Sequence, residues 1–80
     1  MTVKLLAFGI AKDIIGTNAM QLECSDDLTI SDLRIMLEKD YGELGKLSSY
    51  MIAVNDEYAQ PADTLHPGDE IAIIPPVSGG

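Results

Sequence analysis

The stretch LTISDLRIMLEKDYG, residues 28–42, is the clearest helical signal in this 80-residue chain. Thr29 is a favourable N-cap residue, and Asp32 three positions later completes a capping-box pattern. One apolar stripe at helical spacing follows, formed by Ile30, Leu33, Leu37 and Tyr41. Gly42 is expected to supply the C-terminal stop. A single helix of this kind can cover only one face of a sheet.

The first and last apolar segments, TVKLLAF at residues 2–8 and EIAIIP at residues 70–75, predict strands. Each is apolar on both faces, which favours a central position in the sheet. If the two strands are neighbours, the face without the helix carries an apolar patch of Leu6, Phe8, Ala72 and Ile74. Exposed patches of this kind usually mark a protein interface. The alternative is that loops cover these side chains or that they are scattered singly.

Two further elements precede the main helix. Residues 9–16, GIAKDIIG, predict a short helix after the first strand, ended by Gly16. Its isoleucines are expected to point inward: Ile10, Ile14 and Ile15. Residues 19–25, AMQLECS, predict a second strand with one apolar face, formed by Met20, Leu22 and Cys24.

The region after the main helix predicts a hairpin. Residues 51–55, MIAVN, are expected to form a strand, Asn55–Asp56 a turn, and residues 57–60 a short returning strand. A turn-rich stretch with Pro67–Gly68 at its tightest point leads to the last strand. The order strand, strand, helix, strand, short strand, strand predicts one α+β domain with a four- to five-stranded sheet.

The charge of the chain is strongly acidic, with 13 acidic residues against 5 basic ones and a net charge of −8. This balance argues against binding to nucleic acid or to an anionic membrane, and it would steer a basic protein partner towards the domain. No run reaches membrane-spanning length, and no signal peptide is recognisable. Because Cys24 is the single cysteine, an intramolecular disulfide is impossible, and a cytoplasmic location is expected.

The side chains that usually carry catalysis are sparse and scattered. Cys24 belongs to an apolar strand face, where a free cysteine is normally buried, and His66 precedes Pro67 in a loop. The acidic pairs Asp26–Asp27 and Asp56–Glu57 fall at a helix start and in a turn, places that favour carboxylates for structural reasons. We find no metal-ligand spacing, phosphate-binding loop or nucleophile–base pair. A self-contained enzyme is therefore not expected.

The sequence ends in PPVSGG, residues 75–80. Gly79 and Gly80 have no Cβ, so this end can enter a narrow slot and present an unhindered carboxylate. Pro75 and Pro76 restrict the backbone before it. Fully extended, residues 75–80 reach about 20 Å beyond the sheet. From backbone physics alone, a functional tail and an incidental flexible end remain equally open.

Three stretches together resemble the small subunit of molybdopterin synthase, the MoaD family. They are VKLLAFGIAKDIIG, AVNDEYA and, with the highest specificity, PGDEIAIIPPVSGG, which runs from Pro67 to Gly80. The resemblance spans nearly the whole chain. It implies the ubiquitin-like β-grasp fold, a mixed four- to five-stranded sheet with one main helix on one face and a short helix after the first strand. Residues 1–76 would form the domain and residues 77–80 a flexible tail.

What this resemblance implies for function is a non-catalytic sulfur carrier. In such proteins the terminal carboxylate, here that of Gly80, is adenylated and converted to a thiocarboxylate. It then donates sulfur to cyclic pyranopterin monophosphate to form the dithiolene of molybdopterin. Gly79 keeps the tail slim, and four residues guide it: Pro75, Pro76, Val77 and Ser78. The implied partner interface is Leu6, Phe8 and Ile74.

The resemblance also implies the partners. These are the large catalytic subunit of the synthase (MoaE type), an E1-like adenylyltransferase (MoeB type) and a sulfur donor such as a cysteine desulfurase or rhodanese. ATP and magnesium are used by the activating enzyme, and the chain itself is expected to bind no cofactor or metal. A heterotetramer of two small and two large subunits is implied as well.

Three rival interpretations stay open at this stage. The chain could be a related β-grasp sulfur carrier for thiamin or for transfer-RNA thiolation, although PPVSGG favours the molybdopterin route. It could be a ubiquitin-like modifier that forms isopeptide bonds through Gly80. It could also be a binding module whose tail is incidental.

Overall fold

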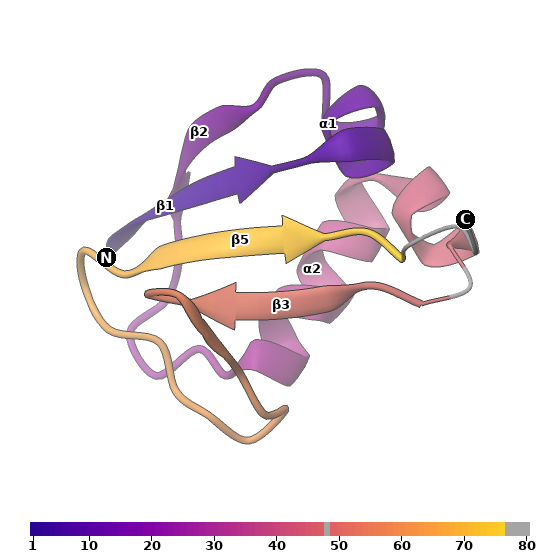
Figure 1. Ribbon diagram of the computed structural model, residues 1–80. Coiled ribbons are helices and arrows are strands. Elements are labelled where there is room, and N and C mark those ends of the chain that lie inside the picture. Colours follow the sequence, from indigo (N-terminus) through magenta and orange to yellow (C-terminus); the bar gives the residue numbers. More distant parts are fainter. Residues whose placement is uncertain (48, 77–80) are drawn as a thin grey trace.

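The computed structural model describes residues 1–47 and 49–76 (Figure 1). Within them the chain forms one five-stranded sheet of order β2-β1-β5-β3-β4, with helices packed against one face. The elements are β1 (Thr2–Ala7), α1 (Gly9–Ile15), β2 (Ala19–Glu23), α2 (Ile30–Asp40), the 3-10 helix η1 (Gly42–Lys46), β3 (Met51–Val54), β4 (Glu57–Tyr58) and β5 (Glu70–Ile74). The sheet is mixed, because β1 and β5 are parallel and the other pairs are antiparallel. The predicted α+β architecture is confirmed.

Helix α2 begins as its sequence predicts. The Asp32 backbone N–H donates to Thr29 Oγ1 at 3.1 Å, and the Thr29 N–H donates to Asp32 Oδ2 at 3.5 Å, so both halves of the capping box are present. Its buried stripe packs on the sheet through Ile30, Leu33 and Leu37. The stop predicted at Gly42 is wrong in its mechanism. Gly42 has no positive φ, and the chain continues from it into η1, whose Leu44 is fully buried.

Helix α1 differs from its prediction in the residue that it buries. Ile10 is 50% exposed, so its expected inward orientation is wrong, whereas Ala11 is completely buried. Ile14 and Ile15 pack partly buried against the core, as expected for positions three and four residues after Ala11. The small Ala11 side chain lets the helix approach the core closely. Gly16 ends the helix as predicted, with φ at 93° and its N–H bonded to the Lys12 carbonyl.

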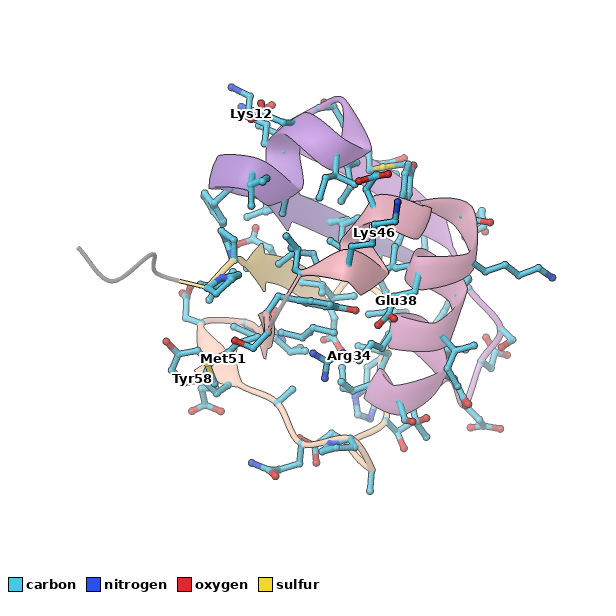
Figure 2. All side chains as sticks on the ribbon, turned by 90° about the vertical axis from the view of Figure 1, so that its right-hand side faces the viewer. Lys12, Arg34, Glu38, Lys46, Met51 and Tyr58 are labelled. Carbon is cyan, nitrogen blue, oxygen red and sulfur yellow. The ribbon has the colours of Figure 1, made fainter. Side chains whose placement is uncertain are left out.

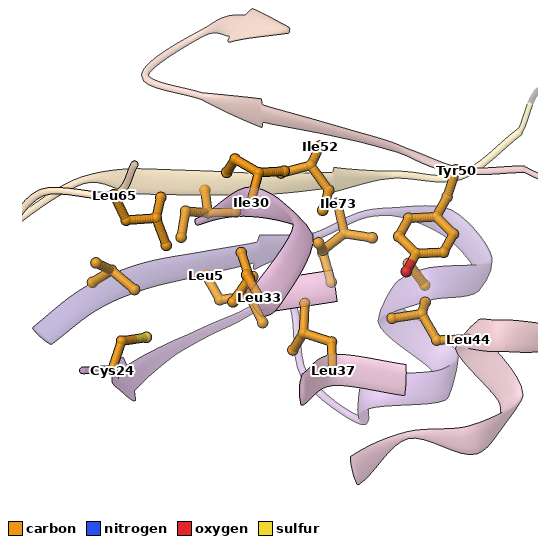
Figure 3. Close-up of a cluster of buried hydrophobic side chains, with 14 residues drawn as sticks. Leu5, Cys24, Ile30, Leu33, Leu37, Leu44, Tyr50, Ile52, Leu65 and Ile73 are labelled. Carbon is orange, nitrogen blue, oxygen red and sulfur yellow. The ribbon is translucent and has the colours of Figure 1, made fainter. Parts of the chain in front are cut away.

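The core forms on the side of the sheet that α2 covers (Figure 3). The inward-facing side chains of the two central strands are almost completely buried: Val3, Leu5, Ala7, Ile71 and Ile73. Cys24, Tyr50 and Leu65 close its margins. The prediction that β1 and β5 are central strands is thus confirmed, since each has a neighbour on both sides.

The β3–β4 hairpin turns at Asn55 and Asp56, as predicted, and both residues have positive φ, at 51° and 70°. Two consecutive positive φ values are typical of the type I′ turn that suits the twist of a hairpin. The Asn55 side chain donates to Asp69 Oδ1 at 3.0 Å and accepts from the Glu70 N–H at 3.0 Å. The hairpin tip therefore holds the start of β5 in place.

Candidate functional site

The face of the sheet opposite α2 is divided into a polar half and an apolar half. Near the start of β1, Lys4 lies opposite Glu70, and their charged groups are 3.9 Å apart. Two residues further along, at the next position on the same face, Leu6 lies opposite Ala72. Beyond that pair, Ile74 at the end of β5 lies opposite Met51. The apolar half is therefore the half from which the chain leaves β5.

We call the apolar residues of this half the open-face patch: Leu6, Phe8, Ala53, Ala72 and Ile74. They line a shallow depression of about 290 Å³. Phe8 is 51% exposed and Leu6 is half-buried, so neither loops nor α2 cover this side. The alternation of β1 and β5 thus predicted correctly which side chains meet. Their role as a partner interface stays a prediction.

The backbone that leaves β5 passes close to the start of α1. Gly9 has φ at +54°, and a Cβ on it would lie 3.2 Å from Pro75 Cγ. A glycine at this position therefore accommodates both the left-handed backbone and the proline ring. Pro75 and Pro76 follow directly after β5 and are half-buried. The remaining predicted tail residues, Val77, Ser78, Gly79 and Gly80, lie outside the described residues.

The two side chains considered for catalysis, Cys24 and His66, differ in exposure. Cys24 is buried, and burial raises the pKa of its thiol, which makes it a poor nucleophile. The His66 side chain is 77% exposed, while its backbone N–H donates to Asp69 Oδ2 at 2.8 Å within the turn before β5. In the part of the chain that the structure describes, no three His, Cys, Asp or Glu side chains are placed to hold a metal ion.

One polar cluster was missed by sequence reasoning (Figure 2). The Arg34 guanidinium lies 4.2 Å from the centroid of the Tyr50 ring and donates to the Tyr50 carbonyl at 2.7 Å. The Tyr50 hydroxyl donates to Glu38 Oε2 at 2.5 Å. Burial, and secondly this bond to Glu38, raise the pKa of Tyr50 to about 12. The cluster holds Tyr50 in place, directly before Met51, the first residue of β3. Its one local signal was the i,i+4 spacing of Arg34 and Glu38.

No helix among the described residues is long and apolar enough to cross a membrane.

The fold places the chain among the ubiquitin-like β-grasp proteins. The small archaeal modifier protein 1 of Haloferax volcanii superposes with a TM-score of 0.81 at 20% identity, over 95% of this chain and 98% of that one. A likeness at this identity shows the fold alone. A chain in the complex of subunits 1 and 2 of molybdopterin-converting factor from Helicobacter pylori is 31% identical, with a TM-score of 0.69 and full coverage of both chains.

Sequence comparison then identifies the family. Residues 5–80 match the ThiS family, so the chain belongs to it. The molybdopterin synthase sulfur carrier subunit of Chlamydomonas reinhardtii is 35% identical, with both chains covered completely. The protein of the same name from Caenorhabditis briggsae is 37% identical, over 100% of this chain and 99% of that one. The resemblance found in the sequence is confirmed over its full length.

Proposed function

We propose that this chain is the sulfur-carrier subunit of a molybdopterin synthase. The observation that carries the proposal is the end-to-end likeness to molybdopterin synthase sulfur carrier subunits, at 35% and 37% identity. The structure supports it in a second way, since an exposed apolar patch lies beside the end of β5. A carrier needs this combination, because its partner must hold the domain while the tail enters a separate active site.

The chemistry that we propose is located at the Gly80 carboxylate. A carboxylate oxygen attacks the α-phosphate of ATP in a MoeB-type activating enzyme that uses magnesium, which gives an acyl adenylate and releases pyrophosphate. The terminal sulfur of a persulfide on a cysteine desulfurase or rhodanese then attacks the acyl carbon and displaces AMP, which gives an acyl disulfide. A thiol reduces the S–S bond of this acyl disulfide and leaves the thiocarboxylate on Gly80. In the synthase this sulfur passes to cyclic pyranopterin monophosphate, and hydrolysis returns the carboxylate. Activation and transfer thus use groups of the partners, which agrees with the burial of Cys24 and the raised pKa of its thiol.

The carrier's own contribution is docking and presentation. We assign docking to Leu6, Phe8 and Ile74, which would pack on the MoaE-type large subunit and, in turn, on the activating enzyme. The complex of the two subunits of molybdopterin-converting factor from Helicobacter pylori supports a partner of this type. The tail from Pro75 through Ser78 would be guided into the active site, with Gly79 leaving the approach to Gly80 unhindered. A heterotetramer in the cytoplasm, where ATP is available, completes the proposal.

The rival interpretations share the fold and differ in the fate of Gly80. A modifier would form isopeptide bonds with lysines, and the archaeal modifier's likeness in fold does not distinguish the two. Carriers for thiamin or transfer-RNA thiolation would receive the same sulfur but pass it to another acceptor. The names of the full-length relatives favour the molybdopterin route over both.

Deletion of Gly79 and Gly80 tests the proposal. The truncated protein should keep its melting temperature, because the core lies within residues 1–76, and it should lose sulfur transfer completely. Gly42→Ala is a matched control: apart from its own chain neighbours, no atom of the described residues lies within 4 Å of the position of the added Cβ, and Gly42 needs no positive φ. Transfer by the truncated protein at the rate of this control would contradict the proposal.

A further inference from the structure

The open-face patch has one polar corner, formed by Asp56 at the hairpin turn and Tyr58 in β4. Both residues line the same depression as Leu6 and Phe8. Tyr58 lies opposite Ala53 of β3, which places it on the open face of the sheet, and it is 63% exposed. A large exposed aromatic beside an apolar patch is typical of residues that dominate binding energy in interfaces.

The two carboxylates around this depression differ in how they are neutralised. Glu70 has Lys4 as its ion-pair partner at 3.9 Å. Asp56 takes part in no ion pair within the described residues, although it too lines the depression. Its backbone is held at φ 70° in a hairpin whose tip is bonded to β5 through Asn55. The Asp56 carboxylate is thus carried on a fixed support at the border of an apolar surface, within a domain of net charge −8.

The same protein shows what chemistry an aromatic ring and a carboxylate attract. At the Arg34 cluster a guanidinium stacks 4.2 Å from the Tyr50 ring centroid and lies 3.7 Å from a Glu38 carboxylate oxygen. The corner has the ring and the carboxylate, and it lacks the cation. Guanidinium fits such a pair better than ammonium, because its plane stacks on the ring while its N–H groups donate to the carboxylate.

From this arrangement we propose that Asp56 and Tyr58 bind an arginine side chain of the large synthase subunit. The inference rests on the proposed function, which supplies that partner, and it adds the polar contact that orients the docked domain. Apolar contacts through Phe8 and Ile74 tolerate sliding, whereas a stacked and hydrogen-bonded guanidinium fixes one register. The Asp56 carboxylate would also repel a large subunit that has an acidic residue at the facing position.

Binding of the full-length chain to its cognate large subunit, measured by calorimetry at about 0.05 M and about 0.5 M salt, tests this inference. Asp56→Asn should weaken binding about fivefold at low salt, and the difference should shrink at high salt because the pair lies near solvent. Tyr58→Leu should weaken binding by a similar factor, about fivefold, while Tyr58→Phe, which keeps the ring, should bind normally. Asp27→Asn is the matched control, an exposed aspartate outside the depression.

A second arm identifies the arginine. Each surface arginine of the large subunit is changed to lysine in turn, and one change should weaken binding without adding to the effect of Asp56→Asn. Normal binding by Asp56→Asn at low salt, or an equal loss with Asp27→Asn, would overturn the inference while leaving the proposed function intact. The inference would also be overturned if Asp56→Asn lost affinity for the activating enzyme alone. If the unaltered chain does not bind the large subunit, both the proposed function and the proposed arginine contact of Asp56 and Tyr58 are wrong.

Discussion

Leu5 and Leu6 are consecutive residues of β1, yet the sheet gives them opposite surroundings. Leu5 is 1% exposed beneath α2, where it packs in the core, whereas Leu6 is half-buried on the open face. The same contrast runs through β5, where Ile73 is fully buried and Ile74 lines the depression. The side chains are alike in size and hydrophobicity, so only the face of the strand distinguishes them.

This contrast separates stability from recognition. Burial of a leucine stabilises the fold only as far as water is removed from it, so the covered face accounts for most of the hydrophobic free energy. An apolar side chain that stays half in water contributes less to folding. Its exposed apolar surface can still be buried by a partner. Substitutions in the open-face patch are therefore expected to change the free energy of unfolding little and to weaken partner binding strongly.

The largest expected difference is between Leu5→Ala and Leu6→Ala. Leu5→Ala should lower the free energy of unfolding by about 3 kcal/mol, because it removes buried methyl groups and leaves a cavity. Leu6→Ala should lower it by less than about 1 kcal/mol, because solvent already reaches that site. Urea denaturation followed by circular dichroism measures both. Equal losses would show that the open face contributes to stability as much as the core does.

The next effect concerns binding through the open-face patch. Phe8→Asp should weaken binding to the large subunit about a hundredfold, since it places a charge in a desolvated interface. Its melting temperature should stay close to that of the unaltered chain. Ile35→Asp is the matched control, because Ile35 is 66% exposed on α2, away from the depression. If the two variants bind equally well, the patch is not the docking surface.

The smallest expected effect concerns Tyr50, at the margin of the core. The pKa of Tyr50 is raised from 10.0 to about 12 in the folded chain, so its hydroxyl stabilises the fold below pH 10 and this contribution is lost as the pH rises through 12. Tyr50→Phe should therefore cost about 1 kcal/mol near neutral pH and progressively less at higher pH. Chemical denaturation at several pH values measures the difference. A constant difference across this range would contradict the assignment.

Local signals made most of the fold predictable. The capping box and apolar stripe of α2 are encoded within residues 28–42, and two consecutive turn formers, Asn55–Asp56, mark the hairpin. Helix η1 was not predictable, because five residues are too short for periodicity and Leu44 is buried by contacts from outside it. The prediction of which side chains of α1 point inward failed for a related reason. In seven residues, packing of the small Ala11 overrides the preference of a larger isoleucine for the core.

The candidate site was predictable where it depends on strand period. Once β1 and β5 are neighbours, alternation alone brings Leu6 and Ala72 together on one face. The polar groups around it were not accessible in this way. The contact of Tyr50 with Glu38 joins residues 12 positions apart, and Asp56 and Leu6 line one depression although they lie far apart in the sequence. Such contacts follow from tertiary structure and leave no spacing in the sequence.

The proposed function requires that Gly80 carries the sulfur and that the folded domain delivers it. Intact-mass spectrometry of the full chain tests this claim most directly, after incubation with a MoeB-type enzyme, ATP, magnesium and a sulfur donor. We expect one oxygen to be replaced by one sulfur at Gly80. Addition of the large subunit and cyclic pyranopterin monophosphate should then form molybdopterin and restore the original mass. An unchanged mass, or sulfur attached at Cys24 instead, would show that Gly80 is not the sulfur carrier.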